Sequence, residues 1–345
     1  MAEWFGHMKF IAELTSSLAE TSQNDPWHNW CAVAASTGQA DPFCCSPAWQ
    51  LSFHEAYAPN RRLFIRECSQ NVVAFAEKRI SDELILLTPI ESSWLFGNPL
   101  LGEHSIDLFS DTLEDIDKYY SPVSPKIFIS GVRPYGTFYK KLKRRFADKF
   151  KFSRYSSGVQ CSASLAGGLD GYLSKRSANF RRKTRKEMRR ALSHGVTLER
   201  VSPNSDPEVD EIYARMIAVE LVSWKGIGQC GMGEPGPKKF YELMMKSLAT
   251  TENARVIFAK HGDKDIGFIF GGVAGGIYRG QQFSYDEEWQ SSSIGNVMQM
   301  EQVDWSCEEG LTRYDMGPLE GSKMSYKYHW TERKHNIETW MLERK

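Results

Sequence analysis

The sequence predicts a mixed α/β protein with two domains, residues 1–160 and 161–345. A chain of 345 residues exceeds one comfortable hydrophobic core, which favours two domains of roughly 150 residues each. The second half then shows the pattern of a strand, two helices, three strands, a loop, a helix and a strand. This order combines an antiparallel meander with one βα crossover in a mixed sheet. We expect the domain boundary at about residues 155–170, near Gly167 and Gly168.

The composition is that of an ordinary water-soluble protein. Hydrophobic residues make up 41% of the chain, and 43 lysines and arginines balance 43 aspartates and glutamates, so no global field attracts nucleic acid or membrane. Seven scattered cysteines without a C-x-x-C pair are typical of free thiols in a reducing compartment. The first eleven residues do not form a signal peptide, and no apolar run reaches the length of a membrane span. We therefore expect a cytoplasmic protein without a membrane span.

The first domain is expected to combine helices with a short meander. Ser46 and Pro47 form a helix start signal, and helical spacing continues towards Ala58. Strand patterns follow at residues 62–67, 72–77, 84–89 and 126–130, with a helical pattern at 105–120. A last amphipathic helix over residues 139–151 would place on one face Tyr139, Leu142, Phe146 and Phe150.

The second domain opens with a strongly basic helix, residues 179–192. Seven of the ten residues from Arg181 to Arg190 are cationic, opposite an apolar stripe that includes Thr184. The basic face of a helix is often only exposed to solvent and binds no ligand. Here the density of charge favours contact with phosphate groups of a cofactor, a carrier protein or RNA. Arg182 and Lys186 are the candidate contacts.

A small-residue loop forms a second candidate phosphate site. It follows a predicted strand at residues 279–285 and leads into a helical pattern at 297–309. The first N–H groups of a helix are unpaired and carry the positive end of its dipole, so they suit a pyrophosphate. An ordinary turn capped by serine or asparagine is the alternative. The candidate residues are Ser292, Ser293, Gly295 and Asn296.

Four short motifs follow one another in the second domain. They are ELVSWKG at residues 220–226, YDE at 285–287, YDMG at 314–317 and YKYHW at 326–330. In this order they resemble the GNAT acyltransferase fold, and within it the acetyltransferase-like proteins related to CelD and, more distantly, to FemAB. The resemblance covers roughly residues 40–340 and implies two GNAT-like lobes in tandem, with donor and acceptor meeting in the second.

The resemblance implies N-acyl transfer from a thioester to an amine. The donor would be acyl-CoA or an acyl carrier protein, used as a co-substrate and not as a tightly bound cofactor. The acceptor would be an amine-bearing small molecule, an amino sugar or a peptide. The reaction needs a polarised carbonyl, a neutral amine and exclusion of water. No metal is expected, because the eight histidines lack ligand-like spacing.

The loop departs from the usual GNAT pyrophosphate pattern and keeps one glycine, Gly295. Two alternatives therefore stay open. One is a FemAB-like aminoacyltransferase that uses charged tRNA, bound like a carrier protein by the helix between Arg181 and Arg190. The other is a catalytically silent GNAT-like module that binds a partner in polysaccharide production.

Individual residues receive candidate roles from this chemistry. Asp286, at a strand end, and Glu220, at a helix end, are candidate bases. Tyr326 is the candidate acid that returns a proton to the leaving thiolate. The alternatives for all of them are turn, surface, core or salt-bridge roles. The candidate substrate contacts are Trp224, Lys225, Tyr285, Asp315 and Lys327.

Overall fold

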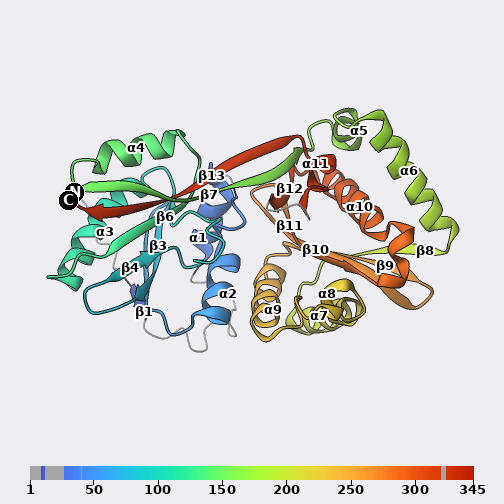
Figure 1. Ribbon diagram of the computed structural model, residues 1–345, viewed down its shortest axis with the longest axis horizontal. Helices are drawn as coiled ribbons and strands as arrows, with labels where there is room; N and C mark the ends of the chain where they lie inside the picture. Colours follow the sequence, from blue (N-terminus) through green and yellow to red (C-terminus); the bar gives the residue numbers. More distant parts are fainter. Residues whose placement is uncertain (1–8, 12–26, 40, 320–323) are drawn as a thin grey trace. The chain divides into compact units, whose positions relative to one another are not determined.

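The computed structural model describes residues 9–11, 27–39, 41–319 and 324–345, in two compact units (Figure 1). Unit 1 is Met1–Gly158 with Asn336–Lys345, and unit 2 is Val159–His335. The chain leaves unit 1 within β7 (Phe150–Ser164) and returns within β13 (Arg333–Arg344). Gly321, where the sequence suggests a turn, and residues 1–8 lie outside the described residues.

Unit 1 is a sheet with helices on both faces. The strand order is β1-β2-β3-β4-β6-β13, antiparallel throughout except for the parallel pair β4 and β6. Its elements before β7 are β1 (Lys9–Ile11), α1 (His28–Ser36), α2 (Pro47–Tyr57), β2 (Leu63–Cys68), β3 (Asn71–Arg79), β4 (Ile85–Thr88), β5 (Leu100–Leu101), α3 (Ser105–Tyr120), β6 (Lys126–Val132) and α4 (Thr137–Phe146).

Successive side chains of a strand point to opposite faces of the sheet, so the core of unit 1 has two parts, one on each face. Phe64 and Phe75 pack with residues of α3 and α4, whereas Leu63 and Ile65 pack with residues of α1 and α2. One expectation was wrong at a boundary. Helix α4 ends at Phe146, and Phe150 begins β7 after a turn, although it packs in the core beside Phe146.

Unit 2 has the predicted order of elements, so the mixed α/β class is confirmed. Figure 1 shows α7, α8 and α9 on one face of its sheet and α5, α6 and α10 on the other. Its elements are α5 (Gly168–Ser174), α6 (Ala178–Ser193), β8 (Val196–Val201), α7 (Asp206–Leu221), α8 (Trp224–Ile227), α9 (Pro235–Ala249), β9 (Ala254–His261), β10 (Lys264–Ala274), β11 (Ile277–Tyr285), the 3-10 helix η1 (Glu287–Ser292), α10 (Ile294–Glu308), β12 (Arg313–Pro318) and α11 (Lys327–Trp330).

The two units repeat one arrangement. In each, a strand and helices precede an antiparallel meander, and a helix then leads to a strand parallel to the third meander strand. The parallel pairs are β4 with β6 and β11 with β12. Helix α3 of unit 1 therefore corresponds to α10 of unit 2, which agrees with two GNAT-like lobes in tandem.

The helices give one further finding. Within the described ranges, none of them combines the length and the apolar character needed to cross a bilayer.

Candidate active site

Strands β11 and β12 diverge in the middle of unit 2. Their parallel pairing runs from Ile277 and Arg313 to Arg279 and Asp315, whereas β11 continues to Tyr285. A bulge in the pairing of β11 with β10 lies at the same place, between Phe270 and Gly271. The second half of β11 thus lies next to a gap in the ladder, where an extended ligand can reach the strand edge.

Helix α10 begins beside this divergent half of β11. Ser293 precedes the helix in a left-handed conformation (φ +57°), and its side chain does not cap the helix. Among the described residues, the backbone N–H groups of Ile294 and Gly295 have no acceptor, while those of Asn296 and Val297 bond to the Ser293 carbonyl. These free donors suit an anion.

The basic helix α6 lies against the beginning of α10. A cavity of about 230 Å³ separates them, and we call it the α6–α10 cavity. The Asn296 amide donates to both carboxylate oxygens of Glu187, at 3.3 and 3.2 Å, and so joins the two helices. The cavity is lined by Lys183, Lys186, Glu187, Arg190, Ser292 and Ser293.

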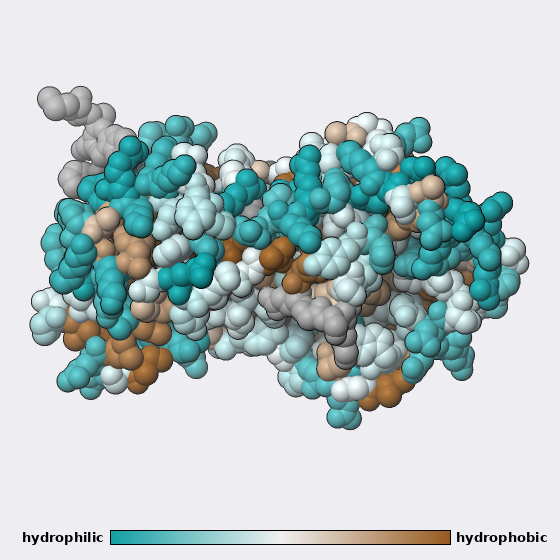
Figure 2. Space-filling view, turned by 45° about the horizontal axis from the view of Figure 1, so that its top comes forward, coloured by the Kyte–Doolittle hydropathy of each residue, from teal (hydrophilic) through white to brown (hydrophobic). Residues whose placement is uncertain are grey.

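The positive charge of α6 is largely uncompensated. Lys183 lies 3.8 Å from Glu187. Within the described part of the chain, no carboxylate lies within 4.0 Å of the other five cations that follow Arg181: Arg182, Arg185, Lys186, Arg189 and Arg190. Figure 2 shows hydrophilic side chains gathered over the end of unit 2 that carries this helix. Helix α6 therefore offers a phosphate group several cations that have no carboxylate partner among the described residues.

Aromatic side chains border the cavity side of β11. A Cβ added at Gly295 would lie 3.3 Å from Tyr285 and 3.4 Å from Phe283, so the first turn of α10 rests on both rings. The Tyr326 ring packs edge-on against Phe283, with centroids 6.1 Å apart. Burial raises the pKa of Tyr326 to about 12, so its hydroxyl is protonated at neutral pH. The Phe283 ring thus contacts both the first turn of α10 and the ring of Tyr326.

Asp286 has a structural role at the end of β11. One of its carboxylate oxygens accepts the Glu288 N–H at 3.1 Å and caps η1, and the other pairs with Lys264 at 2.7 Å. The carboxylate is buried, whereas Lys264 is well exposed. These contacts account for Asp286 as the turn acceptor that the sequence offered as an alternative.

Glu220 and Lys225 lie on the opposite face of β11, in a buried network. Glu220 accepts hydrogen bonds from the Met232 N–H and, at 3.0 Å, from the Ser284 hydroxyl. Lys225 Nζ donates to Gln282 Oε1 at 2.7 Å and lies 3.9 Å from Glu220 Oε2. Burial lowers the pKa of Lys225, and the Glu220 carboxylate opposes that shift. The ELVSWKG motif therefore fixes α8 and the loop after it to the strand.

Trp224 of the same motif is exposed, unlike its neighbour Lys225. It is 51% exposed, with Leu221 at 62% and Ile227 at 65% beside it in sequence. Because α8 is anchored through Lys225, these apolar groups are held at the surface of unit 2 on the β11 side that carries Glu220. This position suits a contact with the acceptor.

Asp315 and Lys327, two predicted substrate contacts, lie buried. Asp315 pairs with Arg279 at 3.8 Å and Arg313 at 3.7 Å, and it accepts the Gly317 N–H. Lys327 Nζ donates to the Pro318 carbonyl at 2.5 Å. Both residues hold the end of β12, which is a structural role.

Gly317 admits the Arg279 guanidinium to Asp315. Its φ is +73°, and a Cβ there would collide with that guanidinium. We expect Gly317→Ala to lower the free energy of unfolding by about 3 kcal/mol or more, because it strains the backbone and displaces a buried charge pair. Gly310→Ala is the matched control, with φ +72° and open space around the added carbon, and should cost only about 1 kcal/mol. Equal losses in urea unfolding would contradict the role given to Arg279.

Of the predicted phosphate contacts, the cavity lining contains Lys186, Ser292 and Ser293. Asn296 bonds to Glu187 of the lining, and Gly295 lies in the same first turn of α10. Arg182 lies outside the cavity lining and donates to Asn179 at 2.9 Å. Sequence analysis missed Lys183, Glu187 and Arg190, although their spacing of four and three residues along one helix face could have singled them out. No group of three or more histidine, cysteine, aspartate or glutamate side chains in the described ranges could hold a metal ion.

Comparisons with known proteins agree with this fold. Residues 178–328 match a family model described as Acetyltransferase (GNAT) domain. A search of curated proteins finds no match. A solved protein of unknown function from Bacteroides thetaiotaomicron gives a TM-score of 0.67 at 11% identity and covers 98% of this chain and 100% of its own.

Two other solved structures have names. FemX gives a TM-score of 0.64 at 13% identity, covering 92% of this chain and 96% of its own. L-PGS from Bacillus licheniformis gives 0.57 at 14% identity, covering 92% and 91%. At these identities the likeness shows a shared fold over nearly the whole chain. Residues 178–328 thus match the GNAT acetyltransferase domain, and the chain is an acyltransferase of this fold.

Proposed function

We propose that the protein transfers an acyl group from a thioester, in the first place acyl-CoA, to the amine of a second substrate. The observation that carries this proposal is the α6–α10 cavity. There Lys186 and Arg190 line the cavity together with Ser292 and Ser293, which directly precede α10 and its unpaired N–H groups. A pyrophosphate in this cavity would meet two cations and a helix N-terminus. Glu187 lines it as well, so the anion would lie away from that carboxylate.

The remainder of the donor would run along the divergent half of β11. Its thioester carbonyl would accept a hydrogen bond from the strand edge beyond Arg279, where pairing with β12 has ended. The sulfur would lie towards Tyr326, which contacts Phe283 on the same strand. The acceptor would approach from the face that carries Trp224.

We assign the proton transfers to Tyr326 and Glu220. The amine nitrogen attacks the thioester carbonyl carbon and the C–S bond breaks. The amine proton passes through the Ser284 hydroxyl to Glu220, and the Tyr326 hydroxyl gives its proton to the leaving thiolate. Glu220 is preferred to Asp286 because it accepts the Ser284 hydroxyl on the side of β11 that carries Trp224, whereas Asp286 caps η1 and pairs with Lys264.

Thiol release from a panel of acyl-CoA thioesters, with and without primary amines, tests the proposal. We expect amine-dependent release together with an acylated amine detected by mass spectrometry. If no acyl-CoA is cleaved, the CoA assignment is wrong, and acylated carrier protein and aminoacyl-tRNA become the donors to test. If all three donors stay intact with every amine, the protein is a binding module.

A macromolecular donor is the second candidate, and a specific observation favours it. Arg182, Arg185 and Arg189 are exposed, do not line the cavity and have no carboxylate partner among the described residues. A carrier protein or tRNA could bind there through its phosphates or carboxylates. The motifs support membership of the CelD-related group. Seven free cysteines and a thioester substrate suit a reducing cytoplasm.

The two candidate bases can be separated by conservative substitutions. We expect Glu220→Gln to lower kcat by about 100-fold or more, because it removes the proton acceptor. Asp286→Asn should stay within about threefold of the wild type, because asparagine also caps a helix. The reverse result would make Asp286 the base. A thermal unfolding scan of each variant excludes misfolding as the cause.

A further inference from the structure

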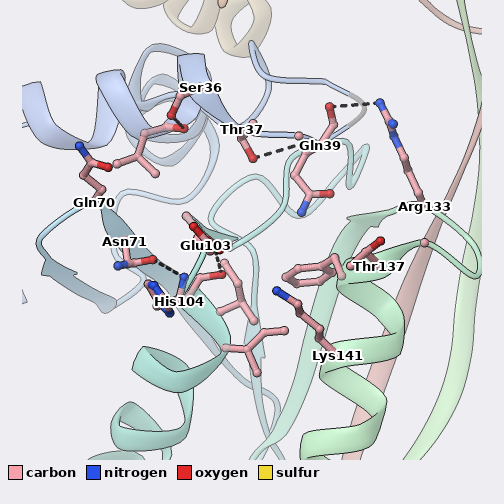
Figure 3. Close-up of a pocket in the computed structure, with 18 residues that line it drawn as sticks. Ser36, Thr37, Gln39, Gln70, Asn71, Glu103, His104, Arg133, Thr137 and Lys141 are labelled. Carbon is pink, nitrogen blue, oxygen red and sulfur yellow. Dashed lines mark hydrogen bonds between the residues drawn. The ribbon is translucent and has the colours of Figure 1, made fainter.

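Unit 1 contains a larger cavity, which the proposed reaction does not use. Its volume is about 740 Å³, within the range of small-molecule pockets. We call it the unit 1 cavity. It lies among the end of α1, the loop before α3 and the beginnings of α3 and α4 (Figure 3). Because α3 corresponds to α10 in the repeated arrangement, both cavities lie at the start of the equivalent helix, but the other walls come from α1 and α4 in unit 1 and from α6 in unit 2.

One side of the unit 1 cavity is cationic. Figure 3 shows Lys141 reaching towards the hollow from α4, and no carboxylate in the described residues pairs with it. Arg133 extends from the end of β6 to the Gln39 carbonyl at 3.5 Å. No side chain caps α3 or α4, which begin at this cavity. An anionic group would be stabilised on this side.

The loop before α3 provides the opposite charge. Glu103 lines the cavity and has no cationic partner in the described residues, and Figure 3 shows it across the hollow from Lys141. Gln70 and Asn71 add side-chain amide groups. The Asn71 side-chain oxygen Oδ1 accepts the His104 N–H at 2.8 Å and so orders the loop. His104 itself lies 3.9 Å from Asp107. The apolar walls are Val33, Leu100, Ile106 and Phe138.

We propose that the unit 1 cavity binds a small molecule that carries a phosphate or carboxylate and, at its other end, an ammonium group. The anion would lie at Lys141, beside Arg133, and the ammonium at Glu103. Neither Lys141 nor Glu103 has an ion-pair partner among the described residues. The cavity is too large for an inorganic anion alone. This site would exist whether or not unit 2 uses CoA.

Isothermal titration of the full-length protein with three matched probes tests the proposal. Glucosamine 6-phosphate carries both charges, glucose 6-phosphate lacks the ammonium and glucosamine lacks the phosphate. We expect glucosamine 6-phosphate to bind most tightly, with one site per chain. Lys141→Glu should weaken it at least about tenfold, as the loss of a charge-assisted hydrogen bond predicts. Glu103→Gln should remove the preference over glucose 6-phosphate.

Lys140→Glu is the control, since Lys140 is exposed on the same helix, does not line the cavity and changes the net charge equally. The dissociation constant of this variant for glucosamine 6-phosphate should stay within about twofold of the wild-type value. The proposal is overturned if no probe binds, if Lys140→Glu and Lys141→Glu weaken binding alike, or if Glu103→Gln leaves the preference unchanged. Lys186→Glu, in unit 2, should not alter this binding, which keeps the result separate from the proposed reaction.

Discussion

Replacing Lys186 and Arg190 together by glutamate is expected to raise the dissociation constant for CoA at least about 100-fold. Both side chains line the α6–α10 cavity, and neither has a carboxylate partner among the described residues. The exchange turns two attractions for the pyrophosphate into two repulsions beside Glu187. Isothermal titration with CoA measures the change directly, and rising salt should weaken wild-type binding as well.

Arg185 and Arg189, replaced by glutamate, form the matched control. They lie on the same helix, alter the net charge by the same amount and do not line the cavity. CoA binding should change by less than about threefold in this variant. If both double variants lose CoA equally, the cavity has no special part in binding. If replacing Arg185 and Arg189 weakens the binding of a carrier protein or tRNA donor, and replacing Lys186 and Arg190 weakens no donor, the macromolecular alternative is correct.

Tyr326→Phe is expected to lower kcat by about 100- to 10,000-fold, while the dissociation constant for CoA stays within about twofold. The phenyl ring keeps the packing against Phe283 but cannot protonate the thiolate. Because burial raises the pKa of Tyr326 to about 12, the acid form persists throughout the neutral range. Wild-type kcat should therefore show no loss from this group between about pH 7 and pH 10.

Changing the pKa of the leaving thiol tests whether Tyr326 acts as an acid or has only a structural role. An activated thioester with a leaving thiol of low pKa needs no proton, so the deficit of Tyr326→Phe should shrink at least about tenfold on such a donor. A deficit of the same size on both donors would show that Tyr326 acts through packing. A loss below about threefold on the ordinary donor would remove it from the mechanism.

Local patterns in the sequence were sufficient for most elements of unit 2. The basic helix was expected at residues 179–192 and is found at Ala178–Ser193, and the strand expected at Val196–Val201 is confirmed. Hydrophobic periodicity and helix start signals depend on residues within one element, so they can be recognised without knowledge of the tertiary structure. Strand β13 was missed because its charged, weakly alternating sequence gains strand structure only by pairing with β6, far earlier in the chain.

The parts of the site that could not be predicted from the sequence depend on how distant elements pack against one another. On an isolated helix Arg182 and Arg190 are equivalent cations. The contact of Glu187 with Asn296 marks the face of α6 that lies against α10. Arg190 lines the cavity on this face, and Arg182 does not. Likewise Asp315 looks free in sequence, and its partner Arg279 becomes evident only when β11 and β12 pair. Such long-range contacts leave no local signature.

A crystal structure of the protein with CoA tests the central claim most directly. The account predicts the pyrophosphate within hydrogen-bond distance of the Gly295 N–H and of Lys186. It also predicts the pantetheine arm along β11 beyond Arg279, with its sulfur towards Tyr326. CoA found elsewhere, for example in the unit 1 cavity, or no CoA at millimolar concentration, would contradict it.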